Sequence, residues 1–361
     1  MPRHYHQSLK KSIKTMNSFI ILLVYTLKLT CGQNVDQMVE KLRHLESFVE
    51  LKGGEFRMGI NDRHGLNFEY PQKKAIVKPF RIFQYPVTIS AFRRYTQDKP
   101  RFRTTADLNG FSYVFTKILV DDSEIFDVES DEVDEGLIGV ANARWNRPEG
   151  GFSQITNRLN HPVTHVSFDD AQAYCAWKGM RLPTEIEWEY TARGGLDGVA
   201  YPWGDMWELR RTNLWQGTFP DDNQLRDGQY GIASVEEYGP QNDYEIYDML
   251  GNVWEWTLTR FRNLSHPMEE DDQERYTVKG GSFLDTRDGD AKSDGIQVRI
   301  SARKGHRRSY TAYNLGFRCC QSMELPEKPV TLPQYKVVRL RPPVHHHTPE
   351  KHEHISHTDE L

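Results

Sequence analysis

The sequence predicts a loop-rich globule with few long helices, in which aromatic side chains anchor the loops that join short elements. Glycine is frequent, with 26 residues in a chain of 361, and the mean hydropathy is −0.71. Aromatic residues make up 12% of the chain and include 8 Trp and 17 Tyr, whose rings can hold loops against a core. The length allows one large domain or about two to three small ones. The net charge of −5 gives no indication of nucleic-acid binding.

Capping residues mark two helices in the middle of the chain. Ser167 can cap a helix over residues 168–178, because its hydroxyl can accept a hydrogen bond from the first turn. Thr184 and Glu187 form a capping box for a second helix, which ends near Arg193. The remaining predicted elements are an amphipathic helix over residues 33–50, strands at 53–59, 75–85 and 161–166, and a helix that begins near Thr88 or Ser90.

Residues 99–160 have the least regular pattern of the chain. Acidic residues gather at 121–124 and 129–135, and they are not spaced with the period of a helix or a strand. We expect a solvated insertion loop here. The alternative is an acidic patch that binds a partner.

The first 32 residues are typical of a secretory signal peptide. Basic residues between 3 and 14 precede a mostly apolar run over residues 17–29, and small residues follow at 30–32. The apolar run is too short to span a bilayer, so we expect cleavage rather than an uncleaved anchor. No other stretch is long and apolar enough to be transmembrane, so no membrane span is expected after cleavage.

The C-terminal segment predicts where the protein resides. Residues 325–361 are rich in Pro, His and charge without an apolar period, so we expect a disordered tail. It ends in Thr358-Asp359-Glu360-Leu361, which is close to the retention signal of the endoplasmic reticulum but departs from it at Thr358. Asn263 begins a glycosylation sequon. Together these features predict a glycoprotein of the endoplasmic reticulum lumen.

Four cysteines are present, and one of them, Cys31, lies in or beside the predicted signal peptide. In an oxidising lumen we expect a long-range disulfide from Cys175 to Cys319 or Cys320. A bridge between the adjacent Cys319 and Cys320 would be strained. One cysteine is therefore left over.

One stretch, residues 247–256, concentrates oxygen ligands and aromatic anchors. Asp248 and Glu255 are hard ligands seven residues apart, and Gly251 and Asn252 between them favour a turn with positive φ. Such a turn can direct backbone carbonyls at an ion, and calcium prefers this mixed oxygen set. The alternative is an aromatic strand after a tight turn, with solvated acidic side chains.

Four blocks of residues occur in order at plausible spacing. They are Gly53-Gly54-Glu55-Phe56-Arg57-Met58-Gly59; Arg181-Leu182-Pro183-Thr184-Glu185-Ile186-Glu187-Trp188-Glu189 with the helix before it; Tyr201-Pro202-Trp203-Gly204; and Gly251-Asn252-Val253-Trp254-Glu255-Trp256 with Gly280-Gly281-Ser282 and Asn314-Leu315-Gly316-Phe317-Arg318-Cys319. In these blocks the chain resembles the formylglycine-generating enzyme (sulfatase-modifying factor) family. The resemblance extends from about residue 50 to about residue 321.

The resemblance implies a single mixed α+β domain over residues 51–324, with low regular secondary structure and a distant relation to C-type lectins. It also implies that the long-range disulfide joins Cys175 and Cys319. Finally, it implies two structural calcium ions. Their ligands would be Asn213, Leu214, Asp227 and Gln229 at the first site, and Asp248, Gly251, Val253 and Glu255 at the second.

The same resemblance predicts a loss of catalysis. The active enzyme oxidises a Cys of nascent sulfatases to formylglycine with two copper(I)-binding Cys, which correspond here to Asp285 and Asp290. Carboxylates do not replace the soft thiolates that copper(I) needs, and no Cys lies between Cys175 and Cys319, so we expect no copper. We interpret residues 285–290 as a polar loop over a vacated pocket. A hard-metal site at Asp285, Asp288 and Asp290 is the alternative.

The predicted function is therefore that of a non-catalytic paralogue of the enzyme. By resemblance, it binds sulfatases or the active enzyme, inhibits sulfatase activation, and forms a homodimer or heterodimer. The first alternative is a diverged oxidase or other enzyme on the same fold that uses Asp285, Asp288, His306 or Tyr310, which should then converge in one pocket. The second is a secreted, calcium-dependent, lectin-like binding module with an open position at a calcium ion.

Overall fold

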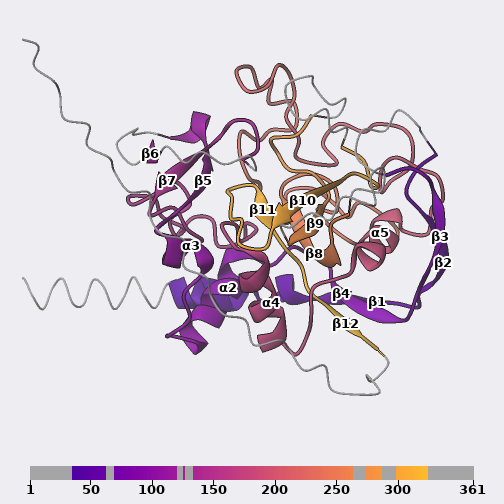
Figure 1. Cartoon of the computed structure of the whole chain (residues 1–361), viewed down its shortest axis with the longest axis horizontal. Coiled ribbons are helices and arrows are strands. Elements are labelled where there is room, and N and C mark those ends of the chain that lie inside the picture. Colours follow the sequence, from indigo (N-terminus) through magenta and orange to yellow (C-terminus); the bar gives the residue numbers. More distant parts are fainter. Residues whose placement is uncertain are drawn as a thin grey trace, which may run out of the picture. The chain divides into compact units, whose positions relative to one another are not determined.

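The computed structural model describes residues 35–61, 69–119, 125–126, 133–262, 274–286 and 298–323. The predicted signal peptide, the tail over residues 325–361, Asn263, Asp288 and Asp290 lie outside these ranges, as do the acidic residues 121–124. The described residues form a single mixed α/β domain with few helices and short, curled sheets (Figure 1). Within these ranges, no helix has both the length and the apolar character that a membrane span requires.

A three-stranded antiparallel sheet joins the two ends of the described chain. Its central strand is β4 (Phe80–Phe83), which pairs with β1 (Phe48–Leu51) on one side and β12 (Cys320–Ser322) on the other. The strands of this sheet therefore come from opposite ends of the domain, as their colours in Figure 1 show.

The helix predicted over residues 33–50 forms only in part. Residues 35–41 are helical, and the 3-10 helix η1 (Arg43–Glu46) follows. The prediction is wrong beyond this point, because the chain becomes strand β1 (Phe48–Leu51). The apolar spacing ends at the buried Leu45, after which the β-prone residues gain hydrogen bonds by pairing with β4.

The helices begin where the capping residues predict. Thr88, Ser167 and Thr184 each accept a hydrogen bond from a backbone N–H three residues further along. Asp170 and Glu187 complete capping boxes with the second and third of these residues. The helices that follow the three caps are α2 (Ile89–Asp98), α4 (Phe168–Trp177) and α5 (Glu185–Arg193).

The central sheet has four strands in the order β10-β9-β8-β11. β9 pairs antiparallel with both β8 and β10, whereas β11 lies parallel to β8. α5 contacts β8 and β9 as well as the hairpin of β2 and β3, so it lies between the hairpin and the sheet (Figure 1). The strands are β2 (Gly54–Met58), β3 (Lys73–Val77), β8 (Trp254–Arg260), β9 (Arg275–Lys279), β10 (Arg303–Arg307) and β11 (Leu315–Gly316).

The prediction of a solvated loop over residues 99–160 is wrong for most of its described part. Val114, Phe115 and Val140 are no more than 1% exposed and belong to the main core. The strands that carry them pair in the order β5-β7-β6, with β7 in the centre. The elements of this region are α3 (Thr105–Asn109), β5 (Phe111–Phe115), η2 (Thr116–Ile118), β6 (Ile125–Phe126) and β7 (Leu137–Ala141).

Long loops make up much of the remaining described chain. No helix or strand lies between α5 and β8, that is, over residues 194–253. The strand predicted over residues 161–166 is absent, and Pro162 forms only an isolated bridge with Thr88. Trp254 and Trp256 of β8 are buried in the main core, as their alternation predicts.

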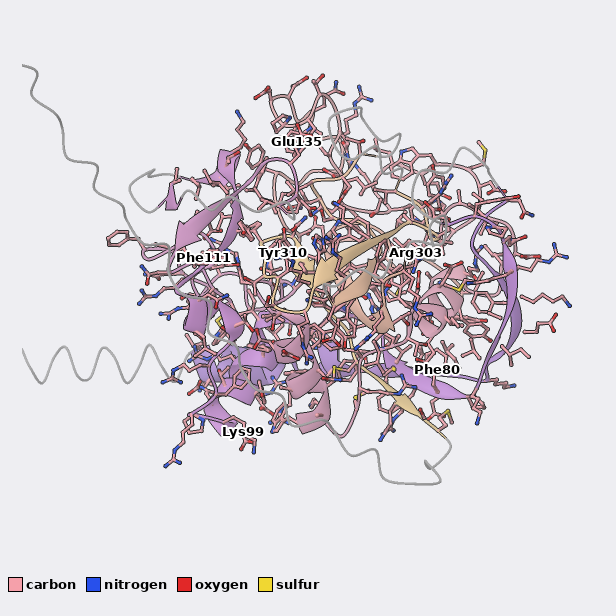
Figure 2. The ribbon with its side chains drawn as sticks, in the orientation of Figure 1. Phe80, Lys99, Phe111, Glu135, Arg303 and Tyr310 are labelled. Carbon is pink, nitrogen blue, oxygen red and sulfur yellow. A yellow bond between two sulfur atoms is a disulfide. The ribbon has the colours of Figure 1, made fainter. Side chains whose placement is uncertain are left out.

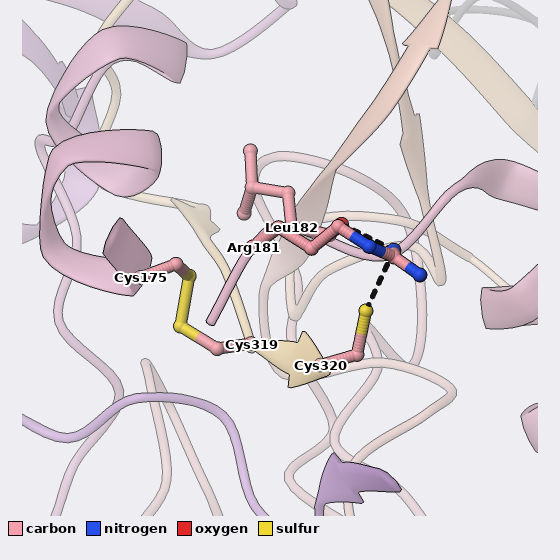
Figure 3. Close-up of a disulfide and its surroundings, with 5 residues drawn as sticks. All are labelled: Cys175, Arg181, Leu182, Cys319 and Cys320. Carbon is pink, nitrogen blue, oxygen red and sulfur yellow. Dashed lines mark hydrogen bonds between the residues drawn. A yellow bond between two sulfur atoms is a disulfide. The ribbon is translucent and has the colours of Figure 1, made fainter. Parts of the chain in front are cut away.

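A disulfide between Cys175 of α4 and Cys319 confirms the pairing that the resemblance implies (Figure 3). Cys319 lies in the main core, whereas the neighbouring Cys320 packs in a second apolar cluster. The Cys320 thiol is buried and accepts a hydrogen bond from Arg181 Nη1 at 3.0 Å. Burial raises the pKa of this thiol, so it stays protonated and unreactive.

Candidate functional site

Asp285 is a buried carboxylate that lies in the turn after β9. Its Oδ2 atom accepts hydrogen bonds from Ser282 N at 2.8 Å, from Ser282 Oγ at 2.6 Å and from Trp254 Nε1 at 2.9 Å. Burial raises the pKa of Asp285 even though the nearby Lys304 and these donors favour its charged form. Asp285 thus joins the turn to the indole of β8.

A second carboxylate reaches the same place from residues 133–135. Asp134 Oδ1 lies 2.7 Å from Lys304 Nζ, and Asp134 Oδ2 lies 3.9 Å from His306 Nε2. Burial alone would raise the pKa of Asp134, but the charge of Lys304 and the His306 ring outweigh it, so its pKa is lowered. His306 stacks on Tyr310, with ring centroids 4.2 Å apart, and Figure 2 labels Tyr310 near the centre of the domain.

Asp134, Asp285 and Lys304 are among the residues that surround a cavity of about 20 Å³, which we call the Asp285 cavity. That volume is enough for about one water molecule and far too small for a peptide side chain. Asn314 Oδ1 is buried there without a hydrogen-bond partner, which is consistent with an ordered water. The lining residues are Asp134, Glu135, Phe219, Leu284, Asp285, Lys304 and Asn314.

The donor set of the Asp285 cavity does not fit copper(I). It offers carboxylates, an amide and an ammonium group, whereas copper(I) prefers thiolates. A hard divalent cation is also poorly served, because Lys304 already places a positive charge beside Asp134. Among the described residues, no three His, Cys, Asp or Glu side chains group as metal ligands.

Two of the residues predicted for the second calcium site, Asp248 and Glu255, contact Arg318. Both Glu255 oxygens accept hydrogen bonds from this buried guanidinium at 2.7–3.0 Å, and Trp188 Nε1 donates to Glu255 Oε2 at 2.8 Å. Arg318 Nη2 also donates to the carbonyl oxygens of residues 247 and 248. Arg318 and Trp188 together place four hydrogen bonds on the two oxygens of Glu255, so a calcium ion would have to share this carboxylate with Arg318.

Asp248 supplies the uncompensated charge of this site. It is 3% exposed, and Asn252 Nδ2 at 2.8 Å is its one side-chain partner in the described part of the chain. Burial raises the pKa of Asp248 to about 7 in the absence of a metal. Asp248, Gly251 and Asn252 all have positive φ, as predicted for the last two, and the Gly251 carbonyl accepts from Val253 N. A buried, poorly compensated carboxylate beside backbone oxygens fits calcium.

Of the residues predicted for the first calcium site, Leu214 and Gln229 contact Asp227 through their backbone N–H groups. Its two oxygens accept hydrogen bonds from Gln229 N at 3.0 Å and Leu214 N at 3.2 Å, and burial raises its pKa. Asn213 Nδ2 donates to Asn252 Oδ1 at 3.1 Å. Asn252 therefore connects the two predicted sites, a role that its position in the turn did not suggest.

Comparison with known proteins assigns the family. The model of the sulfatase-modifying factor enzyme 1-like domain matches residues 35–323. The chain belongs to this family. It is 41% identical to the inactive C-alpha-formylglycine-generating enzyme 2 of Bos taurus over 282 residues, which cover 78% of the chain and 89% of that relative.

Further proteins are similar to this chain in sequence or in structure. The formylglycine-generating enzyme of Mus musculus is 36% identical over 286 residues, which cover 76% of this chain and 75% of the relative. The structure of PvdO from Pseudomonas aeruginosa matches with a TM-score of 0.51 and 21% identity, covering 76% of this chain and 94% of PvdO. The likeness to PvdO supports the fold alone.

The sequence identified Asp285 as a candidate site residue, but it did not identify the side chains that lie around Asp285. Asp134 lies in an acidic run that we interpreted as solvated, and its partner Lys304 is 170 residues away in the chain. No local pattern marks such a pair. Of the residues that the enzyme alternative requires, Asp285 lines the cavity, whereas His306 and Tyr310 do not, although His306 lies 3.9 Å from Asp134. Asp288 is outside the described residues.

Proposed function

We propose that this chain is a non-catalytic member of the formylglycine-generating enzyme family that resides in the endoplasmic reticulum lumen. One observation carries this proposal: the position that corresponds to a copper-binding thiol holds Asp285, which is buried and hydrogen-bonded beside a cavity of about 20 Å³. The likeness to relatives named inactive, at 41% and 40% identity, supports it.

A peptide assay tests the loss of activity. The purified full chain is incubated with a sulfatase peptide that contains the target Cys, with and without copper(I), and formylglycine is detected by mass spectrometry. We expect no conversion, while the active enzyme converts the same peptide in parallel. The Asp285→Cys variant should also stay inactive, because one thiolate does not form a two-thiolate copper centre. Copper-dependent conversion by the wild-type chain would refute the proposal.

We further propose that the protein binds sulfatases or the active enzyme and thereby lowers sulfatase activation. A family member without the thiols can still present the outer surface of the domain. It can therefore compete for the same partners without converting the target Cys to formylglycine. Pull-down from the endoplasmic reticulum lumen should recover these partners, and adding the purified chain to the active enzyme should slow formylglycine formation. An unchanged rate at a large excess of the chain would count against inhibition.

The enzyme alternative retains one favourable observation, because Asp285 and His306 both approach Asp134. The small volume of the Asp285 cavity opposes it, since a substrate would have no space beside these groups. Burial also opposes the lectin-like alternative at the second calcium site. Asp248 and Glu255 are 3% and 0% exposed, so an ion there would lack an open side for a ligand.

A further inference from the structure

A larger cavity, of about 410 Å³, lies between the β2–β3 hairpin, the first turn of α5 and the end of β8. We call it the Glu69 pocket. It shares no lining residue with the Asp285 cavity. Small-molecule sites typically have volumes of about 300–1,000 Å³, so the Glu69 pocket is large enough for a ligand of several carbon atoms.

Buried charged side chains form the inner wall of the Glu69 pocket. Glu185 accepts two hydrogen bonds from Arg303, at 2.7 and 2.9 Å, and Figure 2 labels Arg303 beside α5. Glu189 accepts from Lys279 Nζ at 3.1 Å and from Arg193 Nη2 at 2.7 Å. Burying such pairs is costly, and apolar residues would often stabilise a core better. A charged wall is therefore expected to serve recognition.

The wall carries more positive than negative charge. The cations that line it are Lys73, Arg260, Arg262 and Arg303, and the lining carboxylates are Glu69, Glu185 and Glu189. Two of these cations, Lys73 and Arg262, are exposed at the rim, and neither has an acidic partner in the described part of the chain. This excess of positive charge favours an anionic ligand.

One acceptor in the wall also requires a donor. Glu69 is 4% exposed, and its Oε2 atom pairs with Arg299 at 2.7 Å. Its Oε1 atom is buried without a hydrogen-bond partner. Leaving such an oxygen unpaired is unfavourable, so a ligand with a hydroxyl group would gain free energy here. A simple inorganic anion does not supply this donor.

We propose that the Glu69 pocket binds a small hydroxylated organic acid. Its carboxylate lies between Lys73 and Arg262 at the rim, and one of its hydroxyl groups donates to Glu69 Oε1. This binding activity is separate from the non-catalytic role proposed above, and neither requires the other.

Isothermal titration calorimetry on the purified full chain tests the proposal, with D-glucuronate and citrate as probes. We expect saturable binding of at least one of them, and binding should weaken as salt rises because the rim charges are exposed. Glucose has the hydroxyl groups without the charge, and acetate has the charge without the hydroxyl groups. Both should bind at least about tenfold more weakly, because each lacks one charge-assisted contact.

Rim variants make the test specific. The double variant Lys73→Ala with Arg262→Ala should lose about tenfold or more in affinity, and its exposed positions leave folding intact. Lys74→Ala is the matched control, because Lys74 is the next residue of β3, does not line the pocket and pairs with Glu55. It should bind as the wild type does. The proposal fails if neither probe binds the folded wild type, or if the double variant binds equally well.

Discussion

Asp285 has a structural role in the core of this domain. Three donors converge on its Oδ2 atom, and all three belong to the buried residues Ser282 and Trp254. The carboxylate therefore satisfies donors that would otherwise be unpaired in the core. Asp134 and Lys304 occupy the adjacent space as an ion pair.

Asp285→Ala should lower the free energy of unfolding by about 2–4 kcal/mol, because the Ser282 and Trp254 donors lose their acceptor in a dry site. Urea denaturation followed by tryptophan fluorescence measures this change. Asp222→Ala, at an exposed loop position, is the control and should differ from the wild type by less than about 0.5 kcal/mol. A neutral result for Asp285→Ala would mean that water replaces the carboxylate without cost.

Calcium should stabilise the wild-type chain after treatment with a chelator, since Asp248 and Asp227 are buried carboxylates with raised pKa values. Glu255→Ala should lower the Tm in the chelator, because Arg318 loses its buried partner, at a cost of about 3–5 kcal/mol. Added calcium should then no longer raise the Tm through this site. Asp227→Ala separates the two sites, because it leaves Arg318 paired. A wild-type Tm that is insensitive to calcium would refute both sites.

At the scale of elements, local and distant interactions differ in how well the sequence predicts them. Thr88, Ser167 and Thr184 act on N–H groups three residues away, so their pattern could be recognised directly. Strands β1 and β5 gain their hydrogen bonds from segments that no local pattern identifies. Sequence reasoning therefore recovered α4 and α5 but missed the sheet around β7. The turn at residues 251–252 was predictable because Gly and Asn favour positive φ.

The cap of α4 should make stability depend on pH. Burial raises the pKa of Asp170 to about 7, despite hydrogen bonds from the backbone of Ser167 and Thr105. A carboxyl group whose folded pKa is raised contributes stability at low pH and loses it as pH rises through that value. The wild type should therefore lose stability relative to Asp170→Asn between about pH 4 and pH 7. Urea denaturation at several pH values measures the difference, and a constant difference would contradict the raised pKa.

At the scale of the whole molecule, the Cys175–Cys319 disulfide connects α4 to the C-terminal edge of the domain. The bridge spans a sequence separation of 144 residues, so it restricts the unfolded chain strongly. The family resemblance predicted this pairing, whereas the residues alone left Cys319 and Cys320 as alternatives. The structure separates them because the two side chains enter different apolar clusters.

Removing this bridge with Cys175→Ser and Cys319→Ser should cost about 2–5 kcal/mol of the free energy of unfolding. Thermal denaturation of the double variant, compared with the oxidised wild type that keeps the bridge, measures the effect. Cys320→Ser keeps the bridge. It should lower the free energy of unfolding by about 1–3 kcal/mol, because it alters the buried hydrogen bond to Arg181. Equal losses in both variants would show that the bridge itself adds little.

The sheet β1-β4-β12 also determines when the protein can finish folding during its synthesis. β4 pairs with β12 across 240 residues, as the contact between Arg81 and Gln321 shows. At about 5–20 residues per second, that interval takes on the order of 10–50 s. Throughout this time one edge of β4 is without its partner strand, and unpaired edges are prone to join other chains. Chaperone binding to this edge during translation would therefore protect the nascent chain until residue 322 has emerged.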